Sequence, residues 1–286
     1  MAADPSPSTM RLALLSPIHG QSMDHIARQL DNYRIFLAPF ELRHYFHVSL
    51  ESHPDLQTDL TDLAAREGHS IVFTQRRRPT WRPCTAYALC ELIETALADN
   101  ICHDKVLIHT DTDLLVSTEA KEQLSRNRVG CGDKSFRGDK GGWKWTQKAL
   151  ADPRLRRFVT EMLDGDPSRL RMGRICGAYM NWSEFKIFGV MYNHYFNNSY
   201  FEKNPKRHWP LTEVAIPSIL RLIHGPEVRF CSPLIKVPKN KGVSPRSIDR
   251  LRRRGDSFGL KKISRDTDSD AFQYLMRLQA QAAEEA

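Results

Sequence analysis

The segment KVLIHTDTDLLV, residues 105–116, decides the fold that the sequence predicts. Its first five residues form a short apolar run typical of a strand buried in a sheet. Asp111 and Asp113 follow at the point where that strand is expected to end. The segment therefore predicts the carboxyl end of a buried strand with two carboxylates beside it.

The segments before this strand alternate between strand and helix patterns. The predicted strands are 11–20, 44–51, 69–75 and 105–109, and the predicted helices are 22–37, 56–66 and 84–98. Such alternation predicts an α/β fold, with a mostly parallel sheet and helices on both faces. Because ligands of such sheets bind beyond the carboxyl ends of the strands, we expect residues 16–21, 74–81 and 110–113 to converge at one edge.

The second half of the chain is less regular. Its predicted elements are a loop or short hairpin over 126–145, a strand over 173–182, helices over 183–196 and 210–223, and a late strand or strand pair over 228–237. Residues 239–256 are basic and poor in apolar side chains, so we expect them to be mobile. A short amphipathic helix is predicted in the tail that follows Asp268.

The charge of the chain suits anionic partners as well as simple solubility. The 286 residues include 42 Lys and Arg against 34 Asp and Glu, a formal net charge of +8. Nucleic acid, anionic lipid and phosphorylated small molecules are the partner classes that such a balance favours.

Cysteine usage and the N-terminus indicate where the chain works. Its six cysteines are scattered without a CxxC pair, which argues against a disulfide framework and for a reducing compartment. Residues 1–10 have no signal-peptide pattern, and no apolar run reaches the roughly 18–20 residues of a membrane span. We therefore expect a disordered lead-in over 1–10 and a cytoplasmic protein.

Asp111 and Asp113 are the first candidates for chemistry. Two carboxylates one residue apart at a strand end can bind one Mg²⁺ or Mn²⁺ ion, and such an ion can hold a diphosphate and neutralise its charge. The alternative is structural, because an Asp or Thr within 111–113 can cap a helix over 117–124. The spacing alone leaves both interpretations open.

The order of strands and helices that leads to this DxD motif resembles the nucleotide-diphospho-sugar glycosyltransferases of GT-A fold, over roughly residues 10–225. Residues 81–116 also resemble, more distantly, the core-2/I-branching-type enzymes, which do not use a DxD metal, so the present motif departs from them. The resemblance implies a metal-dependent glycosyltransferase with Mn²⁺ or Mg²⁺ as cofactor. It also implies an inverting transfer from a nucleotide-sugar to a glycan or lipid-linked acceptor, in cell-surface polysaccharide or glycoconjugate synthesis.

The resemblance also suggests how the chain is divided. Residues 11–238 would form one GT-A-like catalytic domain, with a nucleotide-binding half over 11–125 and an acceptor half over 126–238. Residues 239–286 would add a basic C-terminal segment and a short helix. This segment could hold the protein at the inner face of an anionic membrane, since each basic residue near such a surface contributes about 1 kcal/mol.

The candidate site residues fall into three groups. Asp113 and Glu213 are the catalytic candidates, with Glu213 as the base that takes a proton from the acceptor hydroxyl. The alternative for Glu213 is an acid that complements the dipole of a first helical turn. The metal candidates are Asp111, Asp113 and His224. The donor-binding candidates are Ser16, Pro17, His19, Arg76, Arg78, Trp81, Asp111, Lys239 and Lys241.

Two other functions compete with this one. The stretches RRRPTWRP (76–83) and RSIDRLRRR (246–254) could bind nucleic acid. Against this, two aspartates would repel phosphate without a metal, so we expect no nucleic-acid partner. The DxD motif could also belong to a haloacid-dehalogenase-like phosphatase with Asp111 as nucleophile, although that motif normally lies near the N-terminus.

Overall fold

The computed structural model describes residues 9–80, 85–136, 143–204, 208–238, 242–264 and 266–285, apart from the side chain of Phe201. The chain forms an α/β structure around a central six-stranded sheet with strand order β3-β2-β1-β4-β9-β6. These strands are β1 (Arg11–Ile18), β2 (Glu41–Val48), β3 (Ser70–Phe73), β4 (Lys105–Ile108), β6 (Val129–Gly130) and β9 (Ala178–Asn181). No helix among the described residues is long and apolar enough to cross a membrane.

Parallel pairing dominates the sheet. β1, β2, β3 and β4 pair in parallel, whereas β9 runs antiparallel to both β4 and β6. The predicted mostly parallel sheet is therefore confirmed. The second strand begins three residues earlier than the predicted 44–51, because β2 pairs with the whole length of β1, from Arg11↔Glu41 to Ile18↔Val48.

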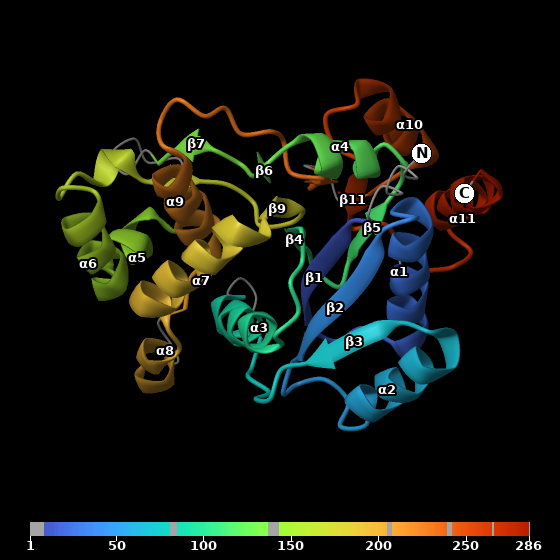
Figure 1. Ribbon diagram of the computed structural model, residues 1–286, viewed down its shortest axis with the longest axis horizontal. Coiled ribbons are helices and arrows are strands. Elements are labelled where there is room, and N and C mark those ends of the chain that lie inside the picture. Colours follow the sequence, from blue (N-terminus) through green and yellow to red (C-terminus); the bar gives the residue numbers. More distant parts are fainter. Residues whose placement is uncertain are drawn as a thin grey trace, which may run out of the picture.

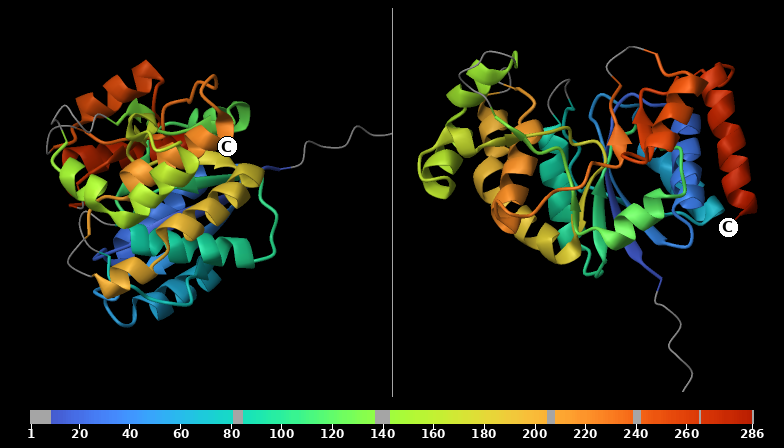
Figure 2. Two further views of the ribbon diagram at one scale, coloured as in Figure 1. Left: turned by 90° about the vertical axis from the view of Figure 1, so that its left-hand side faces the viewer. Right: turned by 90° about the horizontal axis from the view of Figure 1, so that it is seen from above.

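Helices cover both faces of this sheet, as predicted (Figures 1 and 2). On one face lie α1 (Met23–Phe36) and α2 (Leu56–Glu67), and on the other lie α3 (Ala86–Ala98) and α7 (Trp182–Phe196). Ser22 caps α1 by accepting a hydrogen bond from the His25 N–H. Gly189 lets α7 approach α3 closely, because a Cβ there would lie 2.8 Å from Ile93 Cγ2.

A second, three-stranded sheet of order β10-β11-β5 lies beside the carboxyl end of β4. Its strands are β5 (Asp113–Leu115), β10 (Ile235–Lys236) and β11 (Gly259–Lys261). β11 runs antiparallel to β5 and brings Lys261 opposite Asp113. The DxD segment therefore runs into β5, and neither β5 nor its partner β11 was predicted from the sequence patterns.

The C-terminal region is more regular than expected. Residues 239–256 were predicted to be mobile, but they include helix α10 (Pro245–Arg254), which is capped by Ser244 and buries Ile248 and Leu251. That prediction was wrong because two apolar side chains at helical spacing are enough to dock the helix. Helix α11 (Asp270–Glu284) confirms the prediction of a helix in the tail, and it packs against α1 (Figure 1). The domain boundary at 238 stays a prediction.

The remaining described elements lie between Ala120 and His224 in the chain. They are α4 (Ala120–Arg126), β7 (Lys134–Ser135), α5 (Thr146–Ala151), α6 (Pro153–Met162), the 3-10 helix η1 (Pro167–Arg169), β8 (Arg171–Met172), α8 (Ser199–Lys203) and α9 (Thr212–His224). β7 pairs with the distant β8 rather than within a local hairpin. Of the predicted strand 228–237, only Ile235–Lys236 forms a strand, since Pro233 cannot donate to a ladder.

Side-chain amides of α1 hold the DxD segment in place. Asn32 is fully buried; its Nδ2 donates to Leu115 O at 3.0 Å, and its Oδ1 accepts from Leu115 N at 2.7 Å. Gln29 Nε2 donates to Thr110 O at 2.9 Å and to Asp113 O at 2.7 Å. These hydrogen bonds hold the backbone of β5 on the side of α1, and the pairing with β11 holds it on the other side.

We expect Asn32→Leu to lower the free energy of unfolding by about 2–4 kcal/mol, because it leaves the buried N–H and C=O of Leu115 without partners. Urea unfolding followed by circular dichroism measures this change. Gln281→Leu, at an exposed position of α11, is the matched control and should change stability by less than about 0.5 kcal/mol. Equal effects of the two variants would show that the Asn32 bonds do not stabilise β5.

Candidate active site

A pocket of about 580 Å³ opens beyond the carboxyl ends of β1 and β4. These two strands are neighbours, and the chain runs from β1 to one side of the sheet and from β4 to the other. Such a reversal of strand order is the place where open α/β sheets bind ligands. The described lining consists of Pro17, His19, Gln21, Thr80, Thr85, Thr110, Asp111, Thr112, Arg174, Ile175, Cys176, Thr212, Glu213, Val237, Lys261, Lys262 and Ile263.

The predicted convergence of three strand ends is confirmed by this lining. Pro17 lies near the end of β1 and His19 follows it, Thr80 follows β3, and Asp111 follows β4. Glu213 joins them from the first turn of α9. Ser16 is fully buried within β1 and falls outside the described lining.

Asp111 lies at the wall of the pocket and is largely buried. Its Oδ2 accepts a hydrogen bond from the His19 N–H at 2.7 Å, which links the ends of β1 and β4. Burial raises the pKa of Asp111, and the His19 N–H and the Lys261 ammonium oppose that shift. Asp111 is therefore the acid of the DxD pair that a ligand in the pocket can contact.

Asp113 has a different position from the one predicted. Its side chain is completely buried and is not part of the described pocket wall. Oδ2 accepts from the Thr110 N–H at 2.7 Å, and Oδ1 lies 3.4 Å from Lys261 Nζ. Asp113 thus closes the turn after β4 and forms an ion pair with Lys261. This position corrects its assignment as a group that touches a ligand directly.

The alternative interpretation of the DxD motif as a helix cap is also wrong. The helix after it, α4, begins at Ala120, and Glu119 occupies the cap position without a side-chain cap bond. The acids therefore serve the turn between β4 and β5 rather than a helix end.

Lys261 is a charged residue of the pocket lining that the sequence patterns did not point to. It reaches the pocket from β11 and contacts Asp113 Oδ1 and the hydroxyl of Thr110. Burial alone would lower the pKa of Lys261, but attraction to its anionic neighbours, first of all Asp113, outweighs burial and raises it. The sequence signal was the weak strand pattern of GLKKI (259–263), far beyond β4 in the chain.

Glu213 and Arg174 face each other in the pocket. Arg174 Nη1 lies 2.5 Å from Glu213 Oε1, and the Glu213 side chain retains 17% exposure. Burial raises the pKa of Glu213 above the ordinary range for Glu, and the Arg174 guanidinium limits that rise. A partly buried carboxylate with a raised pKa at the edge of a pocket is suited to accept a proton.

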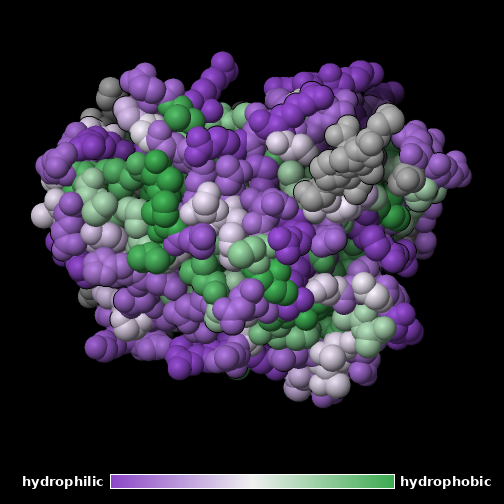
Figure 3. All heavy atoms as spheres, viewed as in Figure 1, coloured by the Kyte–Doolittle hydropathy of each residue, from purple (hydrophilic) through white to green (hydrophobic). Residues whose placement is uncertain are grey.

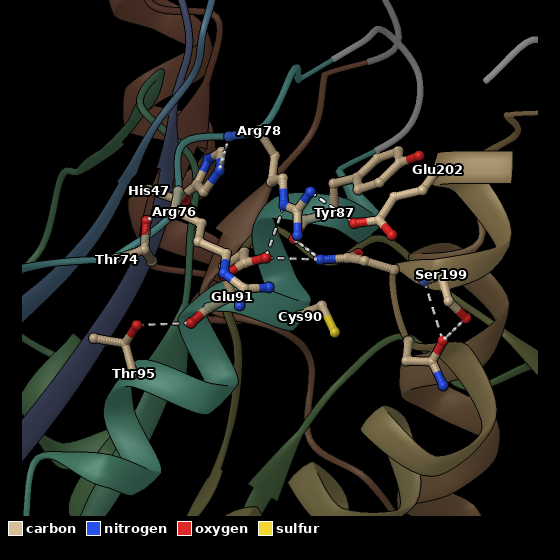
Figure 4. Close-up of polar contacts among 12 residues, drawn as sticks. His47, Thr74, Arg76, Arg78, Tyr87, Cys90, Glu91, Thr95, Ser199 and Glu202 are labelled. Carbon is tan, nitrogen blue, oxygen red and sulfur yellow. Dashed lines mark hydrogen bonds and ion pairs between the residues drawn. The ribbon is translucent and has the colours of Figure 1, made fainter.

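Arg78 and Arg76 do not lie where they were predicted. Arg78 is held between Glu91 Oε1, at 2.9 Å, and Glu202 Oε1, at 2.7 Å, and Figure 4 shows Arg76 beside the same cluster. Neither arginine belongs to the described lining of the pocket. The guanidinium of Arg78 pairs with two carboxylates and thereby connects the loop after β3 to α3 and α8. It does not lie where it could bind a phosphate in the pocket.

His224 is also remote from the acid pair, which corrects its assignment as a metal ligand. Its Nε2 lies 3.5 Å from Glu184 Oε2, and the Glu184 carboxylate in turn accepts from the Asn181 N–H at 3.1 Å. Asn181 pairs with Lys105, the first residue of β4. His224 therefore lies at the amino end of β4, whereas Asp111 follows its carboxyl end. Trp81, Lys239 and Lys241 lie outside the described residues.

The donor atoms around Asp111 and Asp113 do not fit a divalent cation as they stand. Mg²⁺ and Mn²⁺ need several oxygen ligands, but one oxygen of each acid accepts a backbone N–H and the free oxygen of Asp113 faces an ammonium. Among the described residues, Asp31, Glu67 and His69 do bring ligand atoms within 4.8 Å of one another. They lie at the amino end of β3, at the opposite edge of the sheet from the pocket.

Solved structures that are similar to this chain include two glycosyltransferases. The chain is similar to a galactosyltransferase, LgtC, solved in complex with donor and acceptor sugar analogues, at 15% identity, 95% coverage of this chain, 96% of that chain and a TM-score of 0.47. It is also similar to the glycosyltransferase GlyE of Streptococcus pneumoniae TIGR4, at 11% identity, 97% coverage of this chain and a TM-score of 0.40, and spans 63% of that chain.

Sequence comparison adds nothing to this likeness. No protein-family model matches the chain, and no curated protein matches it. At such low identity and TM-score, the likeness to LgtC and GlyE does not assign an activity or a substrate to this chain.

We expect Arg174→Gln to raise the pKa of Glu213 further, because the guanidinium stabilises the charged carboxylate. Carbon-detected NMR titration of the glutamate carboxyl groups measures the shift. Arg169→Gln, which removes an exposed partner of Asp164, is the control and should leave the Glu213 titration unchanged. A lower pKa of Glu213 in Arg174→Gln would contradict the ion pair.

Proposed function

We propose that this protein is a glycosyltransferase that binds a nucleotide-sugar in the pocket between β1 and β4. The observation that carries the proposal is the combination of groups in that pocket. Lys261, Lys262 and Arg174 provide positive charge for a diphosphate, and Glu213 provides a carboxylate with a raised pKa in the same space. A volume of about 580 Å³ is within the usual range of small-molecule sites.

Each group has a proposed role in the transfer. The acceptor is a hydroxyl group of a glycan or of a lipid-linked sugar. Its oxygen attacks the anomeric carbon of the donor, and the bond from that carbon to the diphosphate oxygen breaks. Glu213 takes the hydroxyl proton, and the nucleoside diphosphate leaves with the electron pair. This displacement inverts the anomeric centre; a retaining route stays open if Glu213 is not the base.

The need for Mn²⁺ or Mg²⁺ remains a prediction of the sequence. When bound, such an ion would supply positive charge to the departing diphosphate. The contacts of Asp111 and Asp113 described above weigh against it, and no step of the proposed transfer depends on it.

The proposal extends to the location of the enzyme. Helix α10 exposes Arg246, Arg250 and Arg252–Arg254, while its two apolar residues face inward. The upper right of the molecule, where α10 and α11 lie, is hydrophilic on the side shown in Figure 3. A peripheral contact of a cytoplasmic enzyme with an anionic membrane would therefore be made by charge.

The two competing functions find less support. Arg77 donates to the carbonyls of Ser49 and Ser52, and Arg78 is held by two carboxylates, so these two arginines of the basic stretch after β3 are already engaged within the protein. Asp111 accepts a backbone N–H and is mostly buried, which is a poor arrangement for a phosphatase nucleophile. A donor pocket accounts for more of the observed groups.

The first experiment is a thermal-shift panel of UDP, GDP, CMP, UDP-sugars and GDP-sugars, each with and without Mn²⁺. We expect one nucleotide class to raise the melting temperature, because a ligand that binds only the folded state stabilises it by mass action. No shift with any nucleotide, in a sample shown to be folded, would contradict the proposed function.

We expect Glu213→Gln to lower turnover by about 10²–10⁴-fold while nucleotide affinity stays within about twofold, because the amide cannot accept the hydroxyl proton. Since a carboxylate must be ionised to act as a base, activity of the unmodified enzyme should fall as pH drops through the raised pKa of Glu213. Steady-state kinetics over a pH series test both statements. Full activity of Glu213→Gln would exclude Glu213 as the base.

A further inference from the structure

We propose that Lys261 is the cation that binds the diphosphate of the donor, so that nucleotide binding in this protein requires no divalent metal. The inference rests on the proposed function, because it assigns the charge that the same pocket uses. It replaces the predicted metal ion between Asp111 and Asp113 with an ammonium group of the chain itself.

The position of Lys261 is the first support. Its Nζ lies 3.4 Å from Asp113 Oδ1 and contacts the Thr110 hydroxyl, and the side chain remains 23% exposed at the pocket wall. The ammonium group therefore contacts Asp113, while part of the Lys261 side chain still faces the pocket. An ammonium group carries three N–H donors, and beside Asp113 and Thr110 its third neighbour is the Cys176 thiol, a weak acceptor that a phosphate oxygen can replace.

The coordination of the two acids is the second support. Asp111 Oδ2 accepts the His19 N–H, and Asp113 Oδ2 accepts the Thr110 N–H. A divalent ion between the acids would have to displace Lys261 or lie against its charge, and two like charges in a poorly hydrated site repel strongly. The charge of Asp113 is thus already balanced by a group of the protein.

The backbone fixes Lys261 in this position. β11 pairs with β5 so that Lys261 lies opposite Asp113, and Gly259 allows the close approach because a Cβ there would lie 2.8 Å from the Leu114 carbonyl oxygen of β5. Asn32 holds Leu115 of β5 from the other side. A cation held in place before the donor arrives requires little reorganisation when charge builds on the leaving diphosphate.

The test is isothermal titration of the whole chain with UDP and with GDP, once in EDTA and once in Mn²⁺. We expect the unmodified protein to bind one of them with the same affinity, within about twofold, in both conditions. Lys261→Met should weaken binding in EDTA by roughly 10- to 100-fold, because one charge-assisted hydrogen bond is lost. Lys261→Arg should retain most of the affinity.

Two further variants separate a ligand role from a structural one. Lys261→Met leaves the Asp113 carboxylate buried and unpaired, so its fold is checked by circular dichroism and it is compared with the double variant Lys261→Met/Asp113→Asn. If Lys261 only neutralised Asp113, the double variant would regain nucleotide affinity, whereas a ligand role predicts that it stays weak. Lys236→Met, on the adjacent β10 and paired with Asp256, is the control and should bind normally.

The outcomes distinguish this inference from the proposed function. Binding by the unmodified protein only in Mn²⁺, or undiminished binding by Lys261→Met in EDTA, would overturn the role of Lys261 and leave the glycosyltransferase proposal standing. No binding of either nucleotide in either condition would overturn both.

Discussion

The pairing of β5 with β11 is the constraint on which the site depends. It places Lys261 opposite Asp113 and thereby joins the C-terminal region to the end of β4. A buried carboxylate without a partner is strongly unfavourable, so Asp113 and Lys261 stabilise each other only while the two strands remain paired. Asn32, from α1, secures the other side of β5 through both backbone groups of Leu115. The small sheet thus supplies Lys261 to the wall of the pocket.

The large sheet supplies the location. Because β4 lies beside β1 while the chain continues from β1 to β2 on the other side, the two strand ends leave a gap between their loops. His19 and Asp111 bridge that gap with one hydrogen bond. Glu213 then reaches the same space from α9, whose first turn is tied to the loop at Gly173 by the bond from Gly173 N to Glu213 O. Asp111 and Glu213 therefore line one pocket although they lie about a hundred residues apart in the chain.

Sequence patterns predicted the regular parts well and the charged contacts poorly. Apolar periodicity in segments such as 105–109 and 84–98 depends on local spacing, so the strands, helices and converging loops could be derived from it. Arg78, His224 and Lys261 show the limit. The sequence does not distinguish a charged side chain that faces a ligand from one that pairs with a buried acid, because tertiary contacts determine its partner. The predictions for Arg78 and His224 were wrong for this reason.

The sequence by itself determined the α/β fold, the end of β4 with its two acids, and the place of Glu213 at the start of a helix, because each follows from short-range patterns of apolar and capping residues. Only the tertiary structure decided which acid faces the pocket and which cation accompanies it. Asp111 and Asp113 are separated by one residue, but the turn after β4 directs one to the pocket and buries the other. Lys261 comes from a strand of three residues that pairs with both β10 and β5, and no local signal could specify that pairing.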